Sequence, residues 1–311
     1  MTVRIGALLW PQTNSWAAIR DAAVRADTVG FDSLWTWDHL NAIVGPWEQP
    51  ILEGWATLAG LAPVTRHATL GLMVGANTFR NPGLTAKLAT TLDHVSEGRA
   101  ILGIGGAWFE REHEAFGFET WGTGFGERLD RLDEAVMLLR RLLDGERIAD
   151  HHGRFYTFHD ALCEPRPVQD HLPILIGGSG PRKTLRTTAR YADAWNTGGT
   201  VDEIRQKDAT LRERCAEVGR NSDEIERTYT DWFLIRDDAA EARRVLGEIA
   251  AANGDTLTDD DEVRVGSPQQ IADELRPVVE LGFRHILMDA QAPYDAETIE
   301  RLPEVRELLS T

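Results

Sequence analysis

The chain has 311 residues, of which 42% are hydrophobic, enough for the core of one large enzyme domain. Its 50 acidic and 33 basic residues give a net charge of −17, which argues against nucleic acid or an anionic membrane as a partner. The two cysteines lack the spacing of a disulfide framework or a zinc site, and no apolar run approaches the ~20 residues of a membrane span. These features favour a cytoplasmic enzyme with a small-molecule substrate.

Strand-like and helix-like segments alternate along the first half of the chain, which indicates a parallel α/β architecture. The first strand is predicted over 3–9 and the first helix over 16–28, followed by strands over 33–37, 68–74 and 100–106. The last of these is almost entirely apolar or glycine, as expected of a strand buried on both faces. Five apolar side chains at alternating spacings of three and four then predict a long helix that ends at Gly145.

The second half continues the alternation. More than sixty residues, with a predicted turn at 152–156, separate the fourth strand from the fifth, which is predicted over 173–176. Further strands are expected over 192–196, 228–235 and 285–289, with a second insertion over 237–265. Eight strands with insertions after the fourth and the seventh predict a single (β/α)8 barrel, a TIM barrel, that takes up residues 1–311 as one domain.

Residues able to do chemistry follow several predicted strands. In a barrel of this class, catalytic groups gather at the C-terminal ends of the strands. Asp38 and His39 end the second strand, although an Asp-His pair can also simply cap a turn. Trp10, Trp37 and Trp108 fall at or just beyond the ends of the first, second and fourth strands. Each indole alone could belong to the core, but together they favour a pocket for a flat, mostly apolar ligand.

A glycine-rich turn follows the fifth strand and leads into a helix predicted to begin at Pro181. The turn and the helix start comprise Gly177, Gly178, Ser179, Gly180, Pro181, Arg182, Lys183 and Thr184. Glycine lets the backbone approach a ligand closely, and the free amide groups at a helix N-terminus favour an anion. The segment therefore predicts a phosphate site. A tight turn that needs glycine for its geometry alone is the alternative.

Two other sequence patterns give weaker indications of function. The glycines at 103, 105 and 106 lack the spacing of a dinucleotide-binding fingerprint, so we expect them instead to let a flat ring lie beside Ala107 and Trp108. No His-x-His strand or HExxH motif occurs, and the pair His151-His152 falls in a predicted loop. The sequence thus predicts no metal site.

Five segments, in this order, resemble the luciferase-like monooxygenase superfamily, and in particular its coenzyme F420-dependent oxidoreductases. They are WDH at 37–39, GLMVGANTFRNP at 71–82, GIGGAWFEREH at 103–113, LPILIGGSG at 172–180 and ARYADAWN at 189–196. The set spans nearly the whole chain. The resemblance implies the bacterial luciferase-like form of the barrel, a deazaflavin (coenzyme F420) or FMN as cofactor, and a homodimer.

The resemblance also implies roles for particular residues. The cofactor phosphate would lie by the 177–184 segment, and the ring would lie near His39, Asn77 and Gly106. A cis peptide between Met73 and Val74 would support the ring from behind. His39 would assist proton transfer to or from the substrate, and Asp38 would orient it or stabilise its charge.

The sequence departs from the family's deazaflavin dehydrogenases at two positions. They place a tryptophan a few residues after the Asp-His pair and a glutamate where Trp108 stands, whereas this chain has Ile43 and Trp108. The difference argues against a sugar-phosphate or alcohol substrate. An FMN-dependent monooxygenase and a cofactor-binding protein without catalysis are the alternatives. Because arginine far outnumbers lysine, the chain fits a GC-rich actinobacterial source, where deazaflavin is common.

Overall fold

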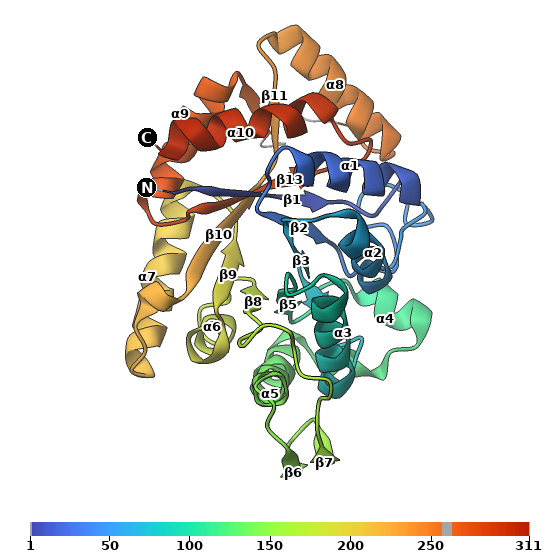
Figure 1. The fold of residues 1–311 in the computed structure, drawn as a ribbon, viewed down its shortest axis with the longest axis vertical. Helices are drawn as coiled ribbons and strands as arrows, with labels where there is room; N and C mark the ends of the chain where they lie inside the picture. Colours follow the sequence, from blue (N-terminus) through green and yellow to red (C-terminus); the bar gives the residue numbers. More distant parts are fainter. Residues whose placement is uncertain (1, 257–262, 311) are drawn as a thin grey trace. The chain divides into compact units, whose positions relative to one another are not determined.

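The computed structural model describes residues 2–256 and 263–310, which form two compact units (Figure 1). Unit 1 comprises Met1–Leu70, Gly198–Val201 and Arg227–Thr311, and unit 2 comprises Gly71–Thr197 and Asp202–Glu226. Each unit combines parallel strands with helices, as the alternating sequence pattern predicts.

The parallel strands of unit 1 are centred on β1 and β13. β1 pairs with β2 on one side and β13 on the other, and β13 pairs in turn with β10. These strands are β1 (Arg4–Leu9), β2 (Ser33–Thr36), β10 (Glu226–Asp231) and β13 (His285–Ala290). A further strand, β3 (Thr69–Leu72), contains the point in the sequence, after Leu70, where unit 1 ends and unit 2 begins. Leu9 lies opposite Ala290, so the carboxyl ends of β1 and β13 lie at the same edge of the sheet.

Helices follow the strands of unit 1 where the sequence provides start signals. Ser15 caps α1, and Ser267 with Gln270 forms the capping box that the sequence predicts at the start of α9. The helices are α1 (Trp16–Thr28), α2 (Gly54–Leu61), the 3-10 helix η1 (Ala62–Val64), α8 (Ala239–Ala252), α9 (Pro268–Glu280) and α10 (Ala296–Ser310). A short second sheet pairs β11 (Phe233–Ile235) with β12 (Arg264–Gly266).

Unit 2 has parallel strands in the order β9-β8-β5-β4. The strands are β4 (Gly75–Ala76), β5 (Leu102–Gly105), β8 (Ile174–Gly177) and β9 (Ala194–Thr197), and β6 (Ile148–His152) forms an antiparallel hairpin with β7 (Thr157–Ala161). The helices are α3 (Pro82–Val95), α4 (Glu110–Phe116), α5 (Phe125–Leu143), α6 (Thr184–Tyr191) and α7 (Val201–Glu217), with the 3-10 helices η2 (Glu119–Trp121) and η3 (Ser222–Glu224). The leucine-rich face of α5 is buried, as its spacing predicts.

Three local predictions are wrong. The predicted strand 228–235 is divided into β10 and β11, because β10 pairs with β13 whereas β11 pairs with β12; the Trp232 amide between them donates to the Asp231 carboxylate (2.8 Å). The helix predicted from Pro181 begins at Thr184, since Lys183 keeps φ −112° and ψ −56°, outside the usual helical values. His151 and His152, predicted in a loop, lie in β6. The second insertion forms α8 and β12, and its residues 257–262 lie outside the described residues.

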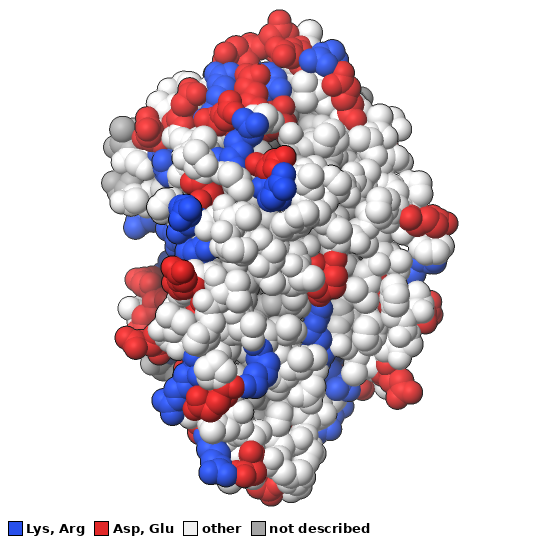
Figure 2. Space-filling view, turned by 45° about the vertical axis from the view of Figure 1, so that its right-hand side comes forward, with Lys and Arg blue, Asp and Glu red and all other residues white. Residues whose placement is uncertain are grey.

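Charged side chains of both signs intermingle on the surface of unit 1 around α8 (Figure 2). Within that helix Arg244 pairs with Glu248 at 2.6 Å. Exposed pairs of this kind contribute ~0–1 kcal/mol each, so the buried strands and helix faces hold the unit together. None of the helices within 2–256 and 263–310 has the length and apolar character needed to cross a membrane.

Candidate functional site

The residues predicted to carry the chemistry fall in both units. Asp38 and His39, with Trp10 and Trp37, belong to unit 1, whereas the predicted cofactor-binding residues belong to unit 2.

In unit 1 the aromatic side chain of Trp37 contacts both Trp10 and His39. The strand β2 ends at Thr36, so all of 37–39 lies beyond the strand. The Trp37 and Trp10 rings are tilted by 40° with centroids 4.3 Å apart, and the His39 ring meets Trp37 edge-on with centroids 5.9 Å apart. Asp38 is buried and His39 is partly exposed. Trp37, which packs against Trp10, therefore contacts an imidazole that solvent can still reach.

Asp289, which sequence reasoning did not assign, belongs to the same group. The Trp10 Nε1–H donates a hydrogen bond to Asp289 Oδ1. Burial raises the pKa of Asp289 to about 7, and the nearby Asp231 carboxylate raises it further, whereas the hydrogen bond from Trp10 lowers it. An acid with this pKa can hold or release a proton near neutrality. Its position near the end of the predicted eighth strand was the available signal.

A second polar network lies at the end of β10. The Tyr229 hydroxyl donates to Asp231 Oδ2 (2.9 Å), and Arg264 Nε donates to the same oxygen (2.6 Å). Burial and the neighbouring Asp231 raise the pKa of Tyr229 to about 12, so the phenol keeps its proton at neutral pH. Arg264 also pairs with Glu274 at 3.1 Å. This network holds Asp231 in place near Asp289.

In unit 2 the predicted cis peptide between Met73 and Val74 is confirmed. The Val74 side chain packs where glycines leave room for it. A Cβ atom added at Gly105 would lie 2.7 Å from Val74 Cγ2, and one added at Gly177 would lie 2.9 Å from Val74 Cγ1. The glycines of β5 and β8 therefore make space for the Val74 bulge, which gives them a steric reason to be glycine.

Asn77 follows directly and is fixed by two hydrogen bonds. Its backbone amide donates to the Gly105 carbonyl (3.1 Å), and its side-chain Nδ2 donates to the Tyr156 hydroxyl (3.3 Å). Both side chains are buried, and burial raises the pKa of Tyr156. Tyr156 lies in the turn of the β6–β7 hairpin and was not identified from the sequence.

Gly106 and Ala107 form a strained turn after β5. Ala107 has φ +62°, a left-handed conformation that non-glycine residues adopt rarely. A Cβ atom at Gly106 would lie 2.8 Å from Leu129 Cδ2. Trp108, next along the chain, is 61% exposed, so it does not belong to the core of unit 2. Strain at this turn is typical of functional sites.

The glycine-rich turn after β8 contains a left-handed residue, as expected of a tight turn that needs glycine for its geometry alone. Gly178 has φ +104°, its amide donates to the Asn196 carbonyl (3.2 Å), and its carbonyl accepts from Trp195 Nε1 (2.8 Å). The turn also leads into the N-terminus of α6, where amide groups favour an anion. Glycine is thus needed for geometry whether or not a phosphate binds.

The basic side chains beside this turn differ in their surroundings. The Lys183 ammonium is 2.6 Å from Asp130 Oδ1 and donates to the Gly126 carbonyl (2.8 Å), so most of its charge is already compensated. Arg182 is exposed, and Thr184 and Ser179 are buried and partly buried at the turn. Arg182 is the basic residue of this segment better placed to meet an anion.

These features of unit 2 fit a flat cofactor with an anionic tail. Backbone at the glycines of β5 and β8, with the Val74 bulge, offers a surface free of large side chains, and the 177–184 segment offers amide groups to a phosphate. A side chain at Gly103 would lie 1.9 Å from the Leu72 carbonyl oxygen, so the chain cannot accept larger residues there without moving.

The comparisons with known proteins agree with this fit. The family model described as luciferase-like monooxygenase matches residues 2–255. A protein of Intrasporangium calvum named F420-dependent glucose-6-phosphate dehydrogenase is 28% identical over 90% of this chain and 91% of its own length.

Solved structures resemble the chain in fold. An F420-dependent secondary alcohol dehydrogenase with an F420-acetone adduct superposes with a TM-score of 0.85, at 20% identity, over 99% of both chains. The oxygenating constituent of a Pseudomonas putida 3,6-diketocamphane monooxygenase with FMN has a TM-score of 0.76, at 19% identity, over 99% of this chain and 98% of its own. The predicted luciferase-like α/β barrel fold is confirmed.

Proposed function

Because the chain belongs to the luciferase-like monooxygenase family, we propose that it is an oxidoreductase that transfers a hydride between coenzyme F420 and a small organic substrate. The observation that carries the choice of cofactor is the similarity, over nine-tenths of the chain, to a relative named for coenzyme F420. The surface formed by the Val74 bulge and the glycines of β5 and β8 carries no large side chain and is compatible with a flat ring, whether deazaflavin or flavin.

Unit 2 supplies the residues that would hold the cofactor. The backbone of Met73 and Val74, the turn at Gly106 and Ala107, and the buried Asn77 would contact the ring. Gly177, Gly178, Ser179, Gly180, Arg182 and Thr184 would bind the phosphate. Coenzyme F420, when bound, supplies the carbon that gives or accepts the hydride.

Unit 1 supplies the proton chemistry. His39 would donate or accept the proton that accompanies oxidation or reduction of the substrate, since the nitrogens of an imidazole can act as proton donor and acceptor. The contact with Trp37 orients the His39 ring. Asp38, buried beside it in the chain, would stabilise the charged imidazole.

The substrate is proposed to be less polar than a sugar phosphate. Ile43 and Trp108 replace the tryptophan and glutamate that the resemblance leads us to expect at these positions. The Ile43 backbone is held in place by Gln12, whose Oε1 accepts the Ile43 amide (2.9 Å). A fixed isoleucine and an exposed indole offer apolar contacts and lack a carboxylate for hydrogen bonds to hydroxyl groups.

An FMN-dependent monooxygenase is the second candidate. The FMN-containing structure with a TM-score of 0.76 shows that this fold also accepts the flavin. A deazaflavin has carbon where a flavin has N5 and reacts poorly with oxygen, so the two candidates differ in whether oxygen is consumed.

Cofactor titration separates the two candidates. The purified chain would be titrated with coenzyme F420 and with FMN, and oxygen uptake would be followed with each reduced cofactor. We expect coenzyme F420 to bind at least tenfold more tightly, ~1.4 kcal/mol, and oxygen uptake to stay at background. Tighter FMN binding with oxygen uptake would establish the monooxygenase instead.

Three further properties belong to the proposal. We propose that residues 1–311 act as one domain, that the chain forms a homodimer and that it works in the cytoplasm. The net charge of −17 is compatible with a protein that binds neither nucleic acid nor an anionic membrane. Light scattering after size-exclusion chromatography should give twice the mass of the chain, and thermal unfolding should show one transition.

A further inference from the structure

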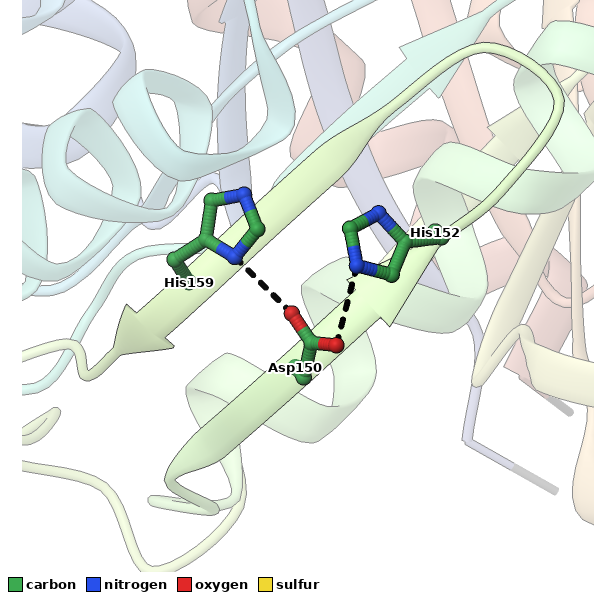
Figure 3. Close-up of side chains that lie close together, drawn as sticks. All are labelled: Asp150, His152 and His159. Atoms are coloured by element: carbon green, nitrogen blue, oxygen red, sulfur yellow. Dashed lines mark hydrogen bonds and ion pairs between the residues drawn. The ribbon is translucent and has the colours of Figure 1, made fainter.

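The β6–β7 hairpin of unit 2 carries three side chains of metal-ligating type on one face (Figure 3). Asp150 and His152 are two residues apart in β6, so their side chains leave the strand on the same side. His159 in β7 is the antiparallel partner of Asp150, which places it on that side too. The backbone of the hairpin therefore brings the three groups together.

Distances between these side chains are short. His159 Nδ1 lies 2.8 Å from Asp150 Oδ1, and His152 Nε2 lies 2.9 Å from Asp150 Oδ2. The centroids of the two imidazole rings are 5.2 Å apart, and the ring planes are inclined at 65°. One potential ligand atom of each residue lies within 4.8 Å of those of the other two, and all three residues are exposed. Among the residues that the structure describes, this is the one group of three such side chains.

We propose that Asp150, His152 and His159 bind a divalent cation of the zinc class. Two imidazole nitrogens and one carboxylate oxygen suit Zn²⁺, with metal–ligand distances of ~2.0–2.2 Å, and a tetrahedral set places the ligand atoms ~3.3 Å apart. The contacts of 2.8 and 2.9 Å involve different oxygens of Asp150, so binding requires each contact to open by about half an ångström and both imidazoles to turn toward one cation. The site lies at the surface, so water or another ligand takes the fourth position.

Hard cations fit these ligands poorly. Mg²⁺ and Ca²⁺ take oxygen ligands almost exclusively, and this site offers one carboxylate and two nitrogens. Imidazole suits zinc, copper and nickel, and the affinity of such sites rises toward copper. We choose Zn²⁺ as the probe because it has no redox chemistry.

The other face of the hairpin is anchored, which holds the ligands in place. His151 Nε2 lies 3.2 Å from Glu134 Oε1 on α5. Glu134 also accepts the backbone amides of Phe155 (3.1 Å) and Tyr156 (3.0 Å) in the turn. A ligand set on an anchored hairpin loses less conformational entropy on binding than one on a free loop.

The bound cation would cross-link β6 and β7 and stabilise the hairpin. The same hairpin presents Tyr156, whose hydroxyl accepts a hydrogen bond from Asn77. The site is distinct from the residues proposed to bind the cofactor. Its role is therefore structural, and metal removal should loosen the hairpin before it affects the rest of unit 2.

Equilibrium dialysis of the tag-free full-length chain against Zn²⁺ tests the proposal. After treatment with a chelator, we expect one Zn²⁺ per chain at saturation. Asp150→Asn, His152→Ala and His159→Ala should each weaken binding by at least about tenfold. His67→Ala is the matched control, because it removes another exposed imidazole far from the hairpin in the sequence, and it should bind as the wild-type chain does.

Two further measurements guard against a misleading result. Far-ultraviolet circular dichroism should show that all four variants fold, which is expected because the changed side chains are exposed. Co²⁺ in place of Zn²⁺ should give the intense visible absorption of a tetrahedral site in the wild-type chain and lose it in His159→Ala. Absence of Zn²⁺ binding by the wild-type chain would overturn the proposal, and so would equal binding by the wild-type chain and the three hairpin variants. In either case the cluster is a hydrogen-bonded surface group only.

Discussion

The two units differ in the features that bear on the proposed function. In unit 1 the relevant features are ionisable and aromatic side chains, such as the hydrogen bond between Trp10 and Asp289 and the contact of Trp37 with His39. In unit 2 the relevant features are backbone conformations and missing side chains, such as the space that Gly105 and Gly177 leave for Val74. In the proposed function, unit 1 supplies proton chemistry and unit 2 supplies a shape.

This difference determines how each unit should respond to mutation. A group that acts through its charge is lost when atoms are removed, and the fold around it survives. A shape that depends on absent side chains is lost when atoms are added, and then stability or binding suffers before chemistry does. Five variants test this division, and each is compared with a control variant or serves as one.

The largest effect is expected from His39→Ala. If His39 transfers the proton, the variant should lose turnover by ~10²–10⁴ while cofactor affinity stays within a few-fold. Steady-state kinetics and cofactor titration measure the two quantities. The control is His67→Ala, which removes an exposed imidazole of unit 1 and should keep full turnover. Near-wild-type turnover of His39→Ala would show that His39 does not transfer the proton.

Gly103→Ala should mainly destabilise the protein. The added Cβ atom would lie 1.9 Å from the Leu72 carbonyl oxygen, which belongs to the backbone and cannot rotate away. We expect the free energy of unfolding to fall by about 3 kcal/mol or more, measured by urea denaturation.

The matching control for that variant is Gly247→Ala. Gly247 lies in α8 of unit 1, and an added Cβ atom meets nothing within 4 Å, so alanine should stabilise the helix by about 0.5–1 kcal/mol. If Gly103→Ala were tolerated as well as Gly247→Ala, the steric account of the β5 glycines would be wrong.

Asp289→Asn should change how stability depends on pH. Burial raises the pKa of Asp289 from 3.8 to about 7, so the folded wild-type chain binds more protons than the unfolded chain between these values. Its contribution to stability is present below pH 4 and is lost as the pH rises toward 7. The asparagine side chain does not titrate, so the variant does not lose stability in this way. The free energy of unfolding of the variant, minus that of the wild-type chain, should therefore rise with pH by at most about 1.4 kcal/mol per pH unit.

Asp295→Asn is the opposite control. Burial acts to raise the pKa of Asp295, but hydrogen bonds from Arg236 and Thr298 lower this pKa below 3.8. Its contribution is present above the unfolded pKa and is lost as the pH falls, so the two variants should differ in the sign of their pH slope. Parallel slopes would show that Asp289 is not protonated at pH 5 in the folded chain.

The strands were the most predictable part of the fold. The glycine-rich and apolar run at 100–106 and the short strand before Asp38 have patterns that physical chemistry restricts strongly. By contrast, the polar sequence of β6 has no apolar alternation and predicts a loop at His151 and His152, and the proximity of His152 to His159 depends on cross-strand pairing. No local sequence motif therefore reveals the group formed by Asp150, His152 and His159.

The site was predictable where its residues are close in sequence. The Met73–Val74 cis peptide, which the resemblance implied, is present. Tyr156 was missed because 79 residues separate it from Asn77, its hydrogen-bond partner. Asp289 was missed because its raised pKa comes from burial and from Asp231, which no local pattern reveals. Both the Tyr156–Asn77 hydrogen bond and the raised pKa of Asp289 depend on contacts between residues far apart in the sequence.

The smallest effect is expected from Gly178→Val, which tests whether the turn after β8 binds the cofactor phosphate. Gly178 has φ +104°, so valine would strain the turn and displace the amide groups before α6. Cofactor affinity should fall by about tenfold, ~1.4 kcal/mol, as measured by titration. The control is Gly219→Val in unit 2, because Gly219 also has a positive φ (+71°) and an added Cβ atom meets nothing within 4 Å. It imposes backbone strain away from the proposed site, so it should lower stability and leave affinity unchanged. If both variants lost affinity equally, strain would explain the loss and the phosphate would have to bind elsewhere.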